Sequence, residues 1–370
     1  MSKSRSGTRR SSGLASRVLK VELGERSYPI QIGFETLEKA GPEIARRTGA
    51  SQVALVTVPA IGRRHAAPLV RSLRGAGLRV HRFEVPDGDA SKNLRQVKRL
   101  YDGFLEKGLD RSSAVVALGG GMVGDLAGFA AASFLRGIAL VQVPTTLLAM
   151  VDASVGGKVG VNLAQGKNLV GAFHQPRLVW IDAAVLRTLP PRMVSAGMAE
   201  VIKAAAIRDR GLLDVLEDQM DELLALDPRK LLPVLERACA IKADVVARDE
   251  RESGLRMILN FGHTLGHAIE ALQRFRGVLH GEAVAMGMVY AAQRSVDLGL
   301  APPRTRPRLE AVIRRAGLPT ELPEFSRKAY LSALQVDKKR RDEHIRYVVL
   351  SRLGRARVIS LTPQEVFPAS

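Results

Sequence analysis

Residues 114–129 read AVVALGGGMVGDLAGF, a short apolar run followed by three glycines and a second apolar segment. The run at 114–118 has the length and composition of a buried strand, and the segment from Gly121 onward has those of a helix. Glycines let a backbone approach a phosphate closely, and a helix N-terminus offers unpaired N–H groups. The pattern lacks the G-x-G-x-x-G spacing, and in isolation a tight packing turn explains it equally well. The stretch therefore predicts a strand–turn–helix unit, with anion binding as its functional interpretation.

The chain on both sides of this unit continues the alternation of strands and helices. Strands are predicted at 18–33 (two, with a turn at 24–26), 53–57, 78–85, 138–143 and 178–181, and helices at 64–76 and 92–107. The pattern is mainly helical from 193 to 298 and again at 307–316 and 328–335, and a small hairpin is predicted around Gly354. We expect a basic tail at 1–17, a Rossmann-like α/β domain at 18–185 and a mainly α-helical domain at 186–370.

The composition is ordinary for a globular protein except for its charge. Hydrophobic residues make up 46% and the net charge is +19, part of it in a basic segment at 1–20 that we interpret as a solvated, disordered tail. No apolar run approaches the roughly 18 residues of a membrane span. The one cysteine, Cys239, cannot form an internal disulfide, and we expect a buried side chain rather than a nucleophile.

Two polar stretches follow predicted strands. In DGDASK, at 87–92, an acid suits ribose hydroxyls and Lys92 suits a phosphate, but a turn with Ser91 as the cap of the next helix is the simpler interpretation. In DASVGGK, at 152–158, acid, hydroxyl, glycines and lysine gather directly after VPTT at 143–146 and before Asn162, Lys167 and Asn168. The lysines suit an anionic ligand, and a solvated loop explains this second stretch poorly.

A carboxylate and three histidines have the composition of a metal site. Glu200 and Lys203 are three residues apart in a helical stretch, and His263 and His267 are four apart, so each pair shares a helix face. His280 follows within 18 residues of His263. Two histidines and a carboxylate with an open position form a common catalytic zinc set. The spacing leaves open which two of the histidines would bind the ion.

These motifs together resemble the 3-dehydroquinate synthases, a family of sugar-phosphate cyclases. The resemblance covers roughly residues 18–360 and rests on PDGDASK, ALGGGMVGDLAGFAAASFLRG, QVPTTLLAMVDASVGGKVGVN, GKNLVGAFHQP, TLPPRMVSAGMAEVIK, RDERESGLRMILNFGHTLGHAIE, LHGEAVAMGM and VDKKR. It implies a dehydroquinate synthase-like fold, in which an NAD-binding α/β domain joins a mainly α-helical metal-binding domain. The active site would lie between the two. It also implies a cytoplasmic homodimer that binds a small-molecule substrate and neither membrane nor nucleic acid.

The resemblance also implies roles for individual residues. The metal, zinc or cobalt, would be held by Glu200, His263 and His280. NAD would meet Asp87, Gly88, Asp89, Lys92, Gly121, Met122, Val123, Gly124, Asp125, Thr145, Thr146, Asp152, Lys158, Lys167 and Thr188. The catalytic group would be Asp152, Lys158, Lys203, Lys242, Arg256, Asn260 and His267. Substrate would also meet Arg136, Asn168, Lys338 and Lys339.

The implied reaction converts the seven-carbon keto acid phosphate DAHP (3-deoxy-D-arabino-heptulosonate 7-phosphate) to 3-dehydroquinate and phosphate, the second step of the shikimate pathway. NAD would transiently oxidise the C5 hydroxyl, phosphate would leave, NADH would return the hydride, and an intramolecular aldol reaction would close the ring. The chain departs from the family pattern at Asp89, where glutamate is common, and at Val58, where a polar residue is frequent. Both departures concern the adenosine side of NAD.

Three other interpretations remain at this stage. A related cyclase acting on glucose 6-phosphate or sedoheptulose 7-phosphate shares most motifs, although SVGGK at 154–158 resembles the dehydroquinate synthases. A metal-dependent alcohol dehydrogenase of similar architecture would release NADH. The net charge favours a nucleic-acid-binding protein, but no aromatic-interleaved basic signature accompanies it.

Overall fold

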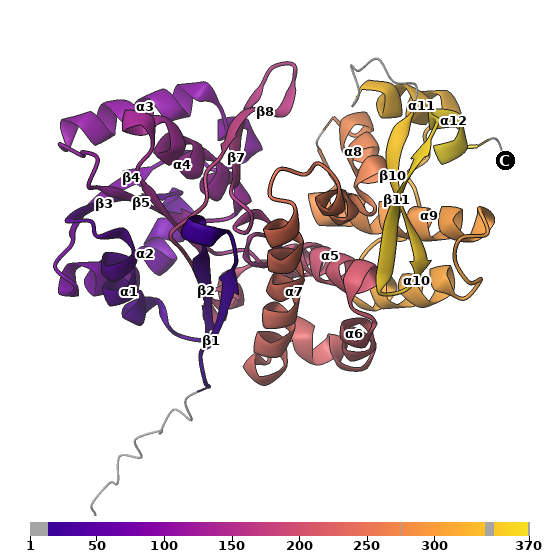
Figure 1. Ribbon diagram of the computed structural model, residues 1–370, viewed down its shortest axis with the longest axis horizontal. Helices are drawn as coiled ribbons and strands as arrows, with labels where there is room; N and C mark the ends of the chain where they lie inside the picture. Colours follow the sequence, from indigo (N-terminus) through magenta and orange to yellow (C-terminus); the bar gives the residue numbers. More distant parts are fainter. Residues whose placement is uncertain (1–13, 275, 337–343, 369–370) are drawn as a thin grey trace, which may run out of the picture.

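A seven-stranded sheet forms the core of the N-terminal half in the computed structural model, which describes residues 14–274, 276–336 and 344–368 (Figure 1). The strand order is β1-β2-β9-β6-β5-β3-β4. All neighbouring pairs are parallel except β1 and β2, which form an antiparallel hairpin. The strands are β1 (Arg17–Val21), β2 (Tyr28–Gly33), β3 (Gln52–Thr57), β4 (Arg79–Glu84), β5 (Ala114–Gly119), β6 (Ala139–Pro144) and β9 (Leu178–Asp182).

Helices cover both faces of this sheet. Helices α1 (Ala40–Thr48) and α2 (Pro59–Gly75) share one hydrophobic cluster with the sheet, and α3 (Leu94–Glu106) and α4 (Gly121–Ser133) share a second cluster on the opposite face. Because both faces are covered, every position of β3 and β5 is buried. Each of these strands therefore appears in the sequence as a continuous apolar run. The predicted alternation of strands and helices is confirmed.

The glycine turn between β5 and α4 is as tight as its sequence predicts. Gly120 is the residue before the helix, and a Cβ on Gly119 would lie 2.6 Å from the Cβ of Val123. A side chain at Gly119 would therefore displace the first turn of α4. The turn places that helix N-terminus at the carboxyl edge of the sheet, next to the end of β6, where Thr145 N–H donates to the Gly119 carbonyl oxygen (2.9 Å).

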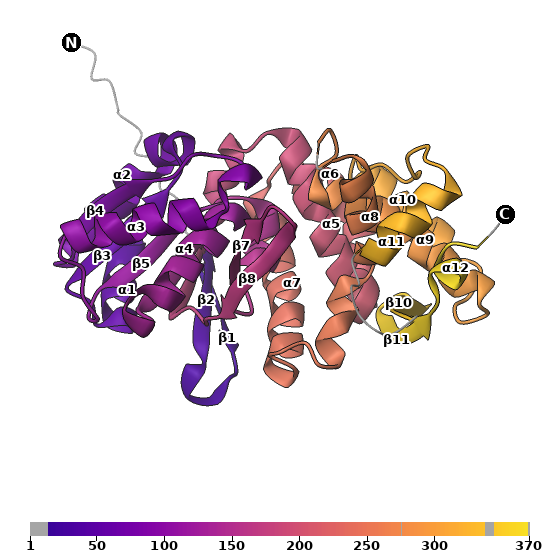
Figure 2. The same cartoon turned by 90° about the horizontal axis from the view of Figure 1, so that it is seen from above.

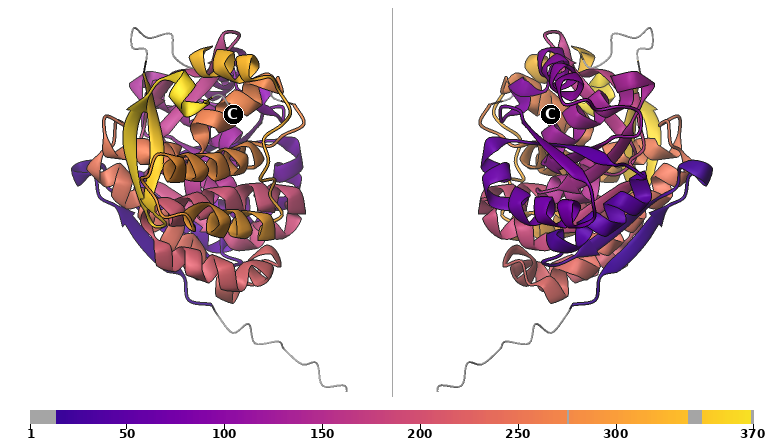
Figure 3. Two further views of the ribbon diagram at one scale, coloured as in Figure 1. Left: turned by 90° about the vertical axis from the view of Figure 1, so that its right-hand side faces the viewer. Right: turned by 90° about the vertical axis from the view of Figure 1, so that its left-hand side faces the viewer.

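The C-terminal half is mainly helical, as expected (Figures 2 and 3). Its central helix is α5 (Pro191–Arg208), which has 13 buried residues and packs against α6, α7 and α9. A hairpin around Gly354 closes the far side. The other elements are α6 (Arg210–Leu224), α7 (Pro228–Arg248), α8 (His263–Leu272), α9 (His280–Asp297), α10 (Thr305–Arg315), α11 (Arg327–Val336), β10 (Ile345–Arg352), β11 (Arg355–Leu361) and α12 (Pro363–Val366). One cluster of buried apolar side chains runs from the sheet into these helices.

One element was not predicted, and one local expectation differs from the structure. The polar stretch after residue 157 is a hairpin, β7 (Lys158–Leu163) and β8 (Gly166–Phe173), whose Val159 and Val161 are buried against α4. The alternation of polar and apolar residues in this stretch is the signal of a strand. Ser91 is not the cap of α3, because Asn93 precedes that helix and its side chain accepts from Gln96 N–H (3.1 Å).

Two expectations about the whole chain can also be compared with the structure. Cys239 is fully buried on α7, as predicted. Among the residues that the structure describes, no helix has the length and apolar character needed to cross a membrane. The division into domains at 185/186 stays a prediction; β9 ends at Asp182 and α5 begins at Pro191.

Candidate active site

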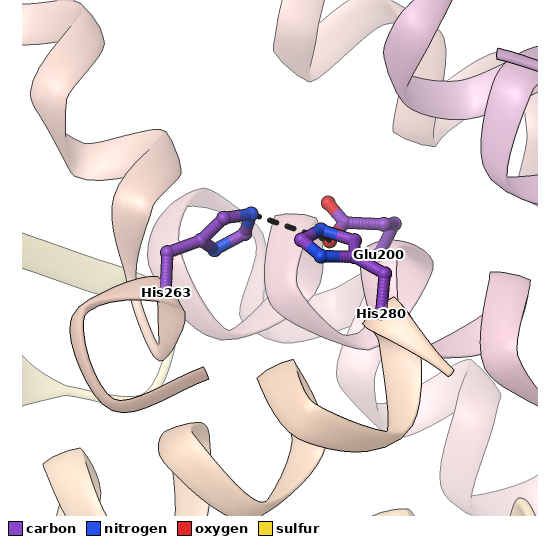
Figure 4. Close-up of side chains that lie close together, drawn as sticks. All are labelled: Glu200, His263 and His280. Atoms are coloured by element: carbon purple, nitrogen blue, oxygen red, sulfur yellow. Dashed lines mark ion pairs between the residues drawn. The ribbon is translucent and has the colours of Figure 1, made fainter. Parts of the chain in front are cut away.

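Three helices of the C-terminal half bring a carboxylate and two imidazoles together. Glu200 comes from α5, while His263 and His280 are the first residues of α8 and α9. Glu200 Oε1 lies 3.7 Å from His263 Nε2 and 4.0 Å from His280 Nε2, and the three side chains point toward one another (Figure 4). Of the histidine pairs that the sequence left open, this geometry selects His263 and His280.

Glycines make this convergence possible, because they let the helix backbones touch. A Cβ on Gly281 would lie 1.9 Å from the carbonyl oxygen of Ala196 on α5. A Cβ on Gly287 would lie 2.0 Å from the carbonyl oxygen of Gly262, which precedes α8. Close approach at these two points holds α9 against both α5 and α8, and so places His280 beside Glu200.

The cluster suits a divalent cation. Glu200 Oε2 pairs with Lys203, but Glu200 Oε1 is buried without a hydrogen-bond partner among the described residues. His263 Nδ1–H donates to the Phe261 carbonyl oxygen (3.2 Å), which leaves a lone pair on the Nε2 that faces Glu200. Burial, reinforced by the charge of Lys203, holds the pKa of His263 well below its usual value. A metal ion binds an imidazole in its neutral form and a carboxylate oxygen that has no other partner, and both groups are present here.

A second charged group lies next to the cluster. Lys242 Nζ on α7 donates to the backbone oxygen of Asp152 (2.6 Å) and forms an ion pair with the Asp152 carboxylate. Burial alone would raise the pKa of Asp152, but the charges of Lys242 and Lys203 outweigh it and lower that pKa. Asp152 is therefore an ionised carboxylate that pairs with Lys242 and is stabilised by the nearby charge of Lys203.

The SVGGK loop brings further polar groups to this region. Arg256, which is buried, donates to the Gly156 carbonyl oxygen (3.1 Å), and the Gly156 N–H donates to the Tyr28 hydroxyl (3.0 Å). Lys158 forms an ion pair with Glu252, and Asn260 Nδ2 donates to the other oxygen of the same carboxylate (2.9 Å). The sequence reasoning missed Glu252. Its signal was an acid within the same RDERESGLRM stretch as Arg256.

The expected nucleotide-binding residues gather at the carboxyl edge of the sheet. Lys92 Nζ is 2.8 Å from Asp125, near the start of α4, and also contacts Asn168 on β8. Lys167 pairs with Asp89 (3.2 Å). The loop after β4, the start of α4 and the hairpin therefore meet at one place, the edge where ligands of open parallel sheets bind.

The remaining residues expected to bind NAD differ in burial and in hydrogen bonding. Thr145 is buried at the end of β6, and its hydroxyl lacks a hydrogen-bond partner among the described residues. The Thr146 hydroxyl accepts from Ala149 N–H (3.2 Å). Val123 packs into the hydrophobic cluster, and its side chain lies against Gly119 of the glycine turn. Of the others, Asp87 and Gly88 are exposed, while Gly121, Met122 and Gly124 are half-buried.

Some expected site residues lie apart from these groups. Arg136 is exposed beyond the C-terminal end of α4, a helix of 13 residues, and is therefore about 20 Å from the glycine turn. Thr188 donates to the Val185 carbonyl oxygen (3.0 Å) and contacts His65 Nε2 (2.8 Å). His267, by contrast, is exposed but lies beside the cluster, with its ring 5.5 Å from that of His263 and 6.1 Å from that of His280. Lys338 and Lys339 lie outside the described residues. The roles of these residues stay predictions.

Comparison with known proteins agrees with this architecture. The sequence models described as 3-dehydroquinate synthase N-terminal and C-terminal match residues 82–196 and 197–340. A 3-dehydroquinate synthase from Nostoc punctiforme is 47% identical over 94% of this chain and 97% of its own length. One from Synechococcus sp. is 49% identical over 94% of this chain and 96% of its own.

Solved structures share the fold. A 2-deoxy-scyllo-inosose synthase complexed with carbaglucose-6-phosphate, NAD+ and Co2+ superposes with a TM-score of 0.85 at 29% identity, covering 95% of this chain and 98% of its own. The 2-epi-5-epi-valiolone synthase of Streptomyces hygroscopicus, with NAD+ and Zn2+ bound, has a TM-score of 0.84 at 28% identity, covering 96% and 97%. The fold and the Glu–His–His cluster define the class of sugar-phosphate cyclases. Within that class, the chain belongs to the 3-dehydroquinate synthase family.

Proposed function

We propose that this protein converts DAHP to 3-dehydroquinate and phosphate, as the second enzyme of the shikimate pathway. The observation that carries the proposal is the buried Glu200 oxygen that faces two imidazole nitrogens beside a cluster of cationic side chains. The relatives support the choice of reaction. The chain is 47–49% identical in sequence to two proteins named 3-dehydroquinate synthase. It is only 28–29% identical to the two solved cyclases described above, which are named for other products.

The proposal includes NAD and a divalent ion, zinc or cobalt, as cofactors. Glu200, His263 and His280 would hold the ion, and the carboxyl edge of the sheet around Lys92 and Asp125 would hold NAD. Solved relatives with NAD+ and Co2+ or Zn2+ support this assignment. When bound, the ion supplies Lewis acidity toward substrate hydroxyls, and NAD supplies reversible hydride transfer.

The chain's own side chains would bind and orient the substrate. A phosphate and a carboxylate need convergent cations and amides, and five of the proposed residues can provide them: Lys158, Lys203, Lys242, Arg256 and Asn260. Asp152 holds Lys242 in place and is, with His267, a candidate for orienting groups or moving protons. Because Lys158 and Asn260 now contact Glu252, substrate anions would compete with that carboxylate for both.

We also propose a cytoplasmic homodimer. Exposed apolar side chains on the β7–β8 hairpin, at Leu163, Leu169 and Phe173, support a surface that a second copy covers. The cytoplasmic location rests on the family resemblance alone. Light scattering of the purified protein would determine the number of chains per particle, and a monomer at assay concentration would contradict the dimer.

One assay tests the function directly. Purified protein with zinc and a catalytic amount of NAD is expected to release phosphate from DAHP without accumulating NADH. Glucose 6-phosphate and sedoheptulose 7-phosphate serve as matched substrates. Phosphate release from either of these but not from DAHP would reassign the chain to another cyclase. Stoichiometric NADH would indicate a dehydrogenase, the activity of more distant structural relatives such as the NADH-dependent butanol dehydrogenase of Thermotoga maritima (TM-score 0.66, 16% identity), a likeness that shows the fold alone.

A further inference from the structure

A buried carboxylate, Glu270 on α8, lies directly behind one of the histidines of the Glu–His–His cluster. Glu270 Oε2 is 3.2 Å from His280 Nδ1, and the glutamate side chain is only 9% exposed. Glu270 is not among the residues proposed to bind the substrate, and it is not one of the three side chains proposed to hold the ion. Its contact with His280 is therefore the feature to explain.

The contact determines how the His280 ring presents its other nitrogen. An ionised carboxylate can only accept a hydrogen bond, so His280 Nδ1 carries a hydrogen, and in the neutral ring the lone pair is then on Nε2. That Nε2 faces Glu200 Oε1, 4.0 Å away. His263 has the same arrangement, except that its Nδ1–H donates to a neutral backbone oxygen, that of Phe261. The two histidines thus differ in the charge of the acceptor behind the ring.

We propose that Glu270 is a positioning residue that orients His280 and selects the tautomer able to bind the metal ion. The inference rests on the proposed metal centre. Glu270 lies outside the set of ligands and would strengthen the binding of the ion through His280. A carboxylate behind a metal-bound imidazole makes the ring a stronger ligand and commonly contributes 10–100-fold, as an order of magnitude, to metal affinity.

The other oxygen of Glu270 is held from the opposite half of the protein. Lys167 Nζ on β8 is 3.5 Å from Glu270 Oε1 and 3.2 Å from Asp89 Oδ2. Glu270 therefore lies between an imidazole on one side and an ammonium group on the other, which restrains its orientation. The Lys167 side chain thus links the β7–β8 hairpin of the N-terminal half to α8 of the C-terminal half, which stand on opposite sides of the junction in Figure 1.

The positioning role of Glu270 must be distinguished from direct binding of an ion by the same carboxylate. Ligand atoms of His267, Glu270 and His280 also lie within 4.8 Å of one another, so Glu270 could itself bind an ion. The two roles differ in what a substitution does. Loss of a positioning residue weakens binding of one ion per chain, whereas loss of a ligand removes an ion.

The test compares Glu270→Gln with Glu270→Asp and with a matched control, Glu282→Gln. Glu282 is two residues after His280, has a side chain only 12% exposed, and pairs with Arg192 instead of a histidine. It also accepts from Leu279 N–H (2.8 Å), a bond that the glutamine oxygen can accept as well. Zinc affinity is measured by chelator competition on the metal-free full chain without substrate, and the visible spectrum of the cobalt-loaded protein reports the ligand field. Thermal unfolding of each metal-free variant checks that it folds.

Glu270→Gln is expected to bind one zinc per chain about 10–100-fold more weakly and to shift the cobalt spectrum. Glu270→Asp, which keeps the charge, should recover part of the loss, and Glu282→Gln should match the wild type. Wild-type affinity and spectrum in Glu270→Gln would overturn the inference alone. A fall from two ions to one would also overturn it, because Glu270 would then be a ligand. A wild-type protein that binds no zinc would overturn the proposed metal centre as well.

Discussion

Lys242 and Asp152 are separated by 90 residues in the sequence and form an ion pair in which the ammonium group also donates to the Asp152 backbone oxygen (2.6 Å). The pair joins α7 of the helical half to the end of the irregular turn at Ala149–Ala153, which follows β6 of the sheet. The two side chains are 10% and 28% exposed. This contact holds together the two halves of the candidate site and supplies it with one of its cations.

Removing the charge of Asp152 should therefore affect both stability and turnover. In Asp152→Asn, the Lys242 ammonium loses its compensating charge, and we expect a loss of about 3 kcal/mol in the free energy of unfolding. Urea denaturation measures this loss. The control is Asp102→Asn, which breaks the exposed pair between Asp102 and Lys98 and should cost at most about 0.5 kcal/mol. Equal stabilities of the two variants would show that the buried pair contributes nothing. Phosphate release by Asp152→Asn should fall on the order of 100-fold.

His263→Ala should remove the proposed ion. Without this imidazole, Glu200 Oε1 faces only His280, and two ligands do not make a stable zinc site. We expect the dialysed variant to retain little zinc by elemental analysis and to lose more than about 100-fold in turnover. His81→Ala is the matched control, because His81 contacts Gln52 at the edge strand β4 and no group of the cluster. Full zinc content in His263→Ala would contradict the ligand assignment.

Gly156→Ala should disrupt the SVGGK loop. The backbone at Gly156 has φ +100°, and a Cβ there would lie 2.5 Å from Arg256 Nη2 and 2.8 Å from Val246 Cγ2. The variant is expected to misplace Arg256 and to lose both thermal stability and turnover, as measured by calorimetry and phosphate release. Gly75→Ala, where a Cβ meets no atom within 4 Å at the end of α2, should change stability by no more than about 1 kcal/mol. Similar melting temperatures for the two variants would contradict this account.

The loop that carries Arg256 should be sensitive to acid through Asp249. Partial burial would raise the pKa of Asp249, but hydrogen bonds from the backbone N–H groups of Ser253, Gly254 and Arg256 outweigh it and lower that pKa to about 2. A carboxyl group with a depressed folded-state pKa stabilises the fold above its unfolded pKa and loses that contribution as the pH falls.

Melting temperatures of the wild type and Asp249→Asn across pH measure this contribution. The wild type should be the more stable above about pH 4, and the difference should shrink as the pH falls toward 2. Asp244→Asn is the control, because Asp244 accepts only from exposed arginine side chains on and beside α7. A difference between wild type and Asp249→Asn that does not change with pH would exclude the proposed linkage.

The sequence by itself predicted the local structure well where periodicity and glycines carry the signal. Continuous apolar runs predicted β3, β5, β6 and β9, because strands covered on both faces have no polar side. The triple glycine predicted the β5–α4 turn, because a Cβ at Gly119 would collide with Val123. The β7–β8 hairpin was not predicted, since its polar residues and glycines, such as Asn162, Gly166, Lys167 and Asn168, are also typical of a loop.

The tertiary structure alone decided which distant side chains meet. Spacing along one helix places His263 and His267 on a common face, yet the partner of His263 in the cluster is His280, on another helix, because backbone contacts at Gly281 and Gly287 set where α9 crosses α5 and α8. Glu270 and Glu252 likewise acquire their partners only through packing between elements. A sequence pattern reports the neighbours of a residue within its own helix or strand, whereas a site built from several elements depends on how those elements pack.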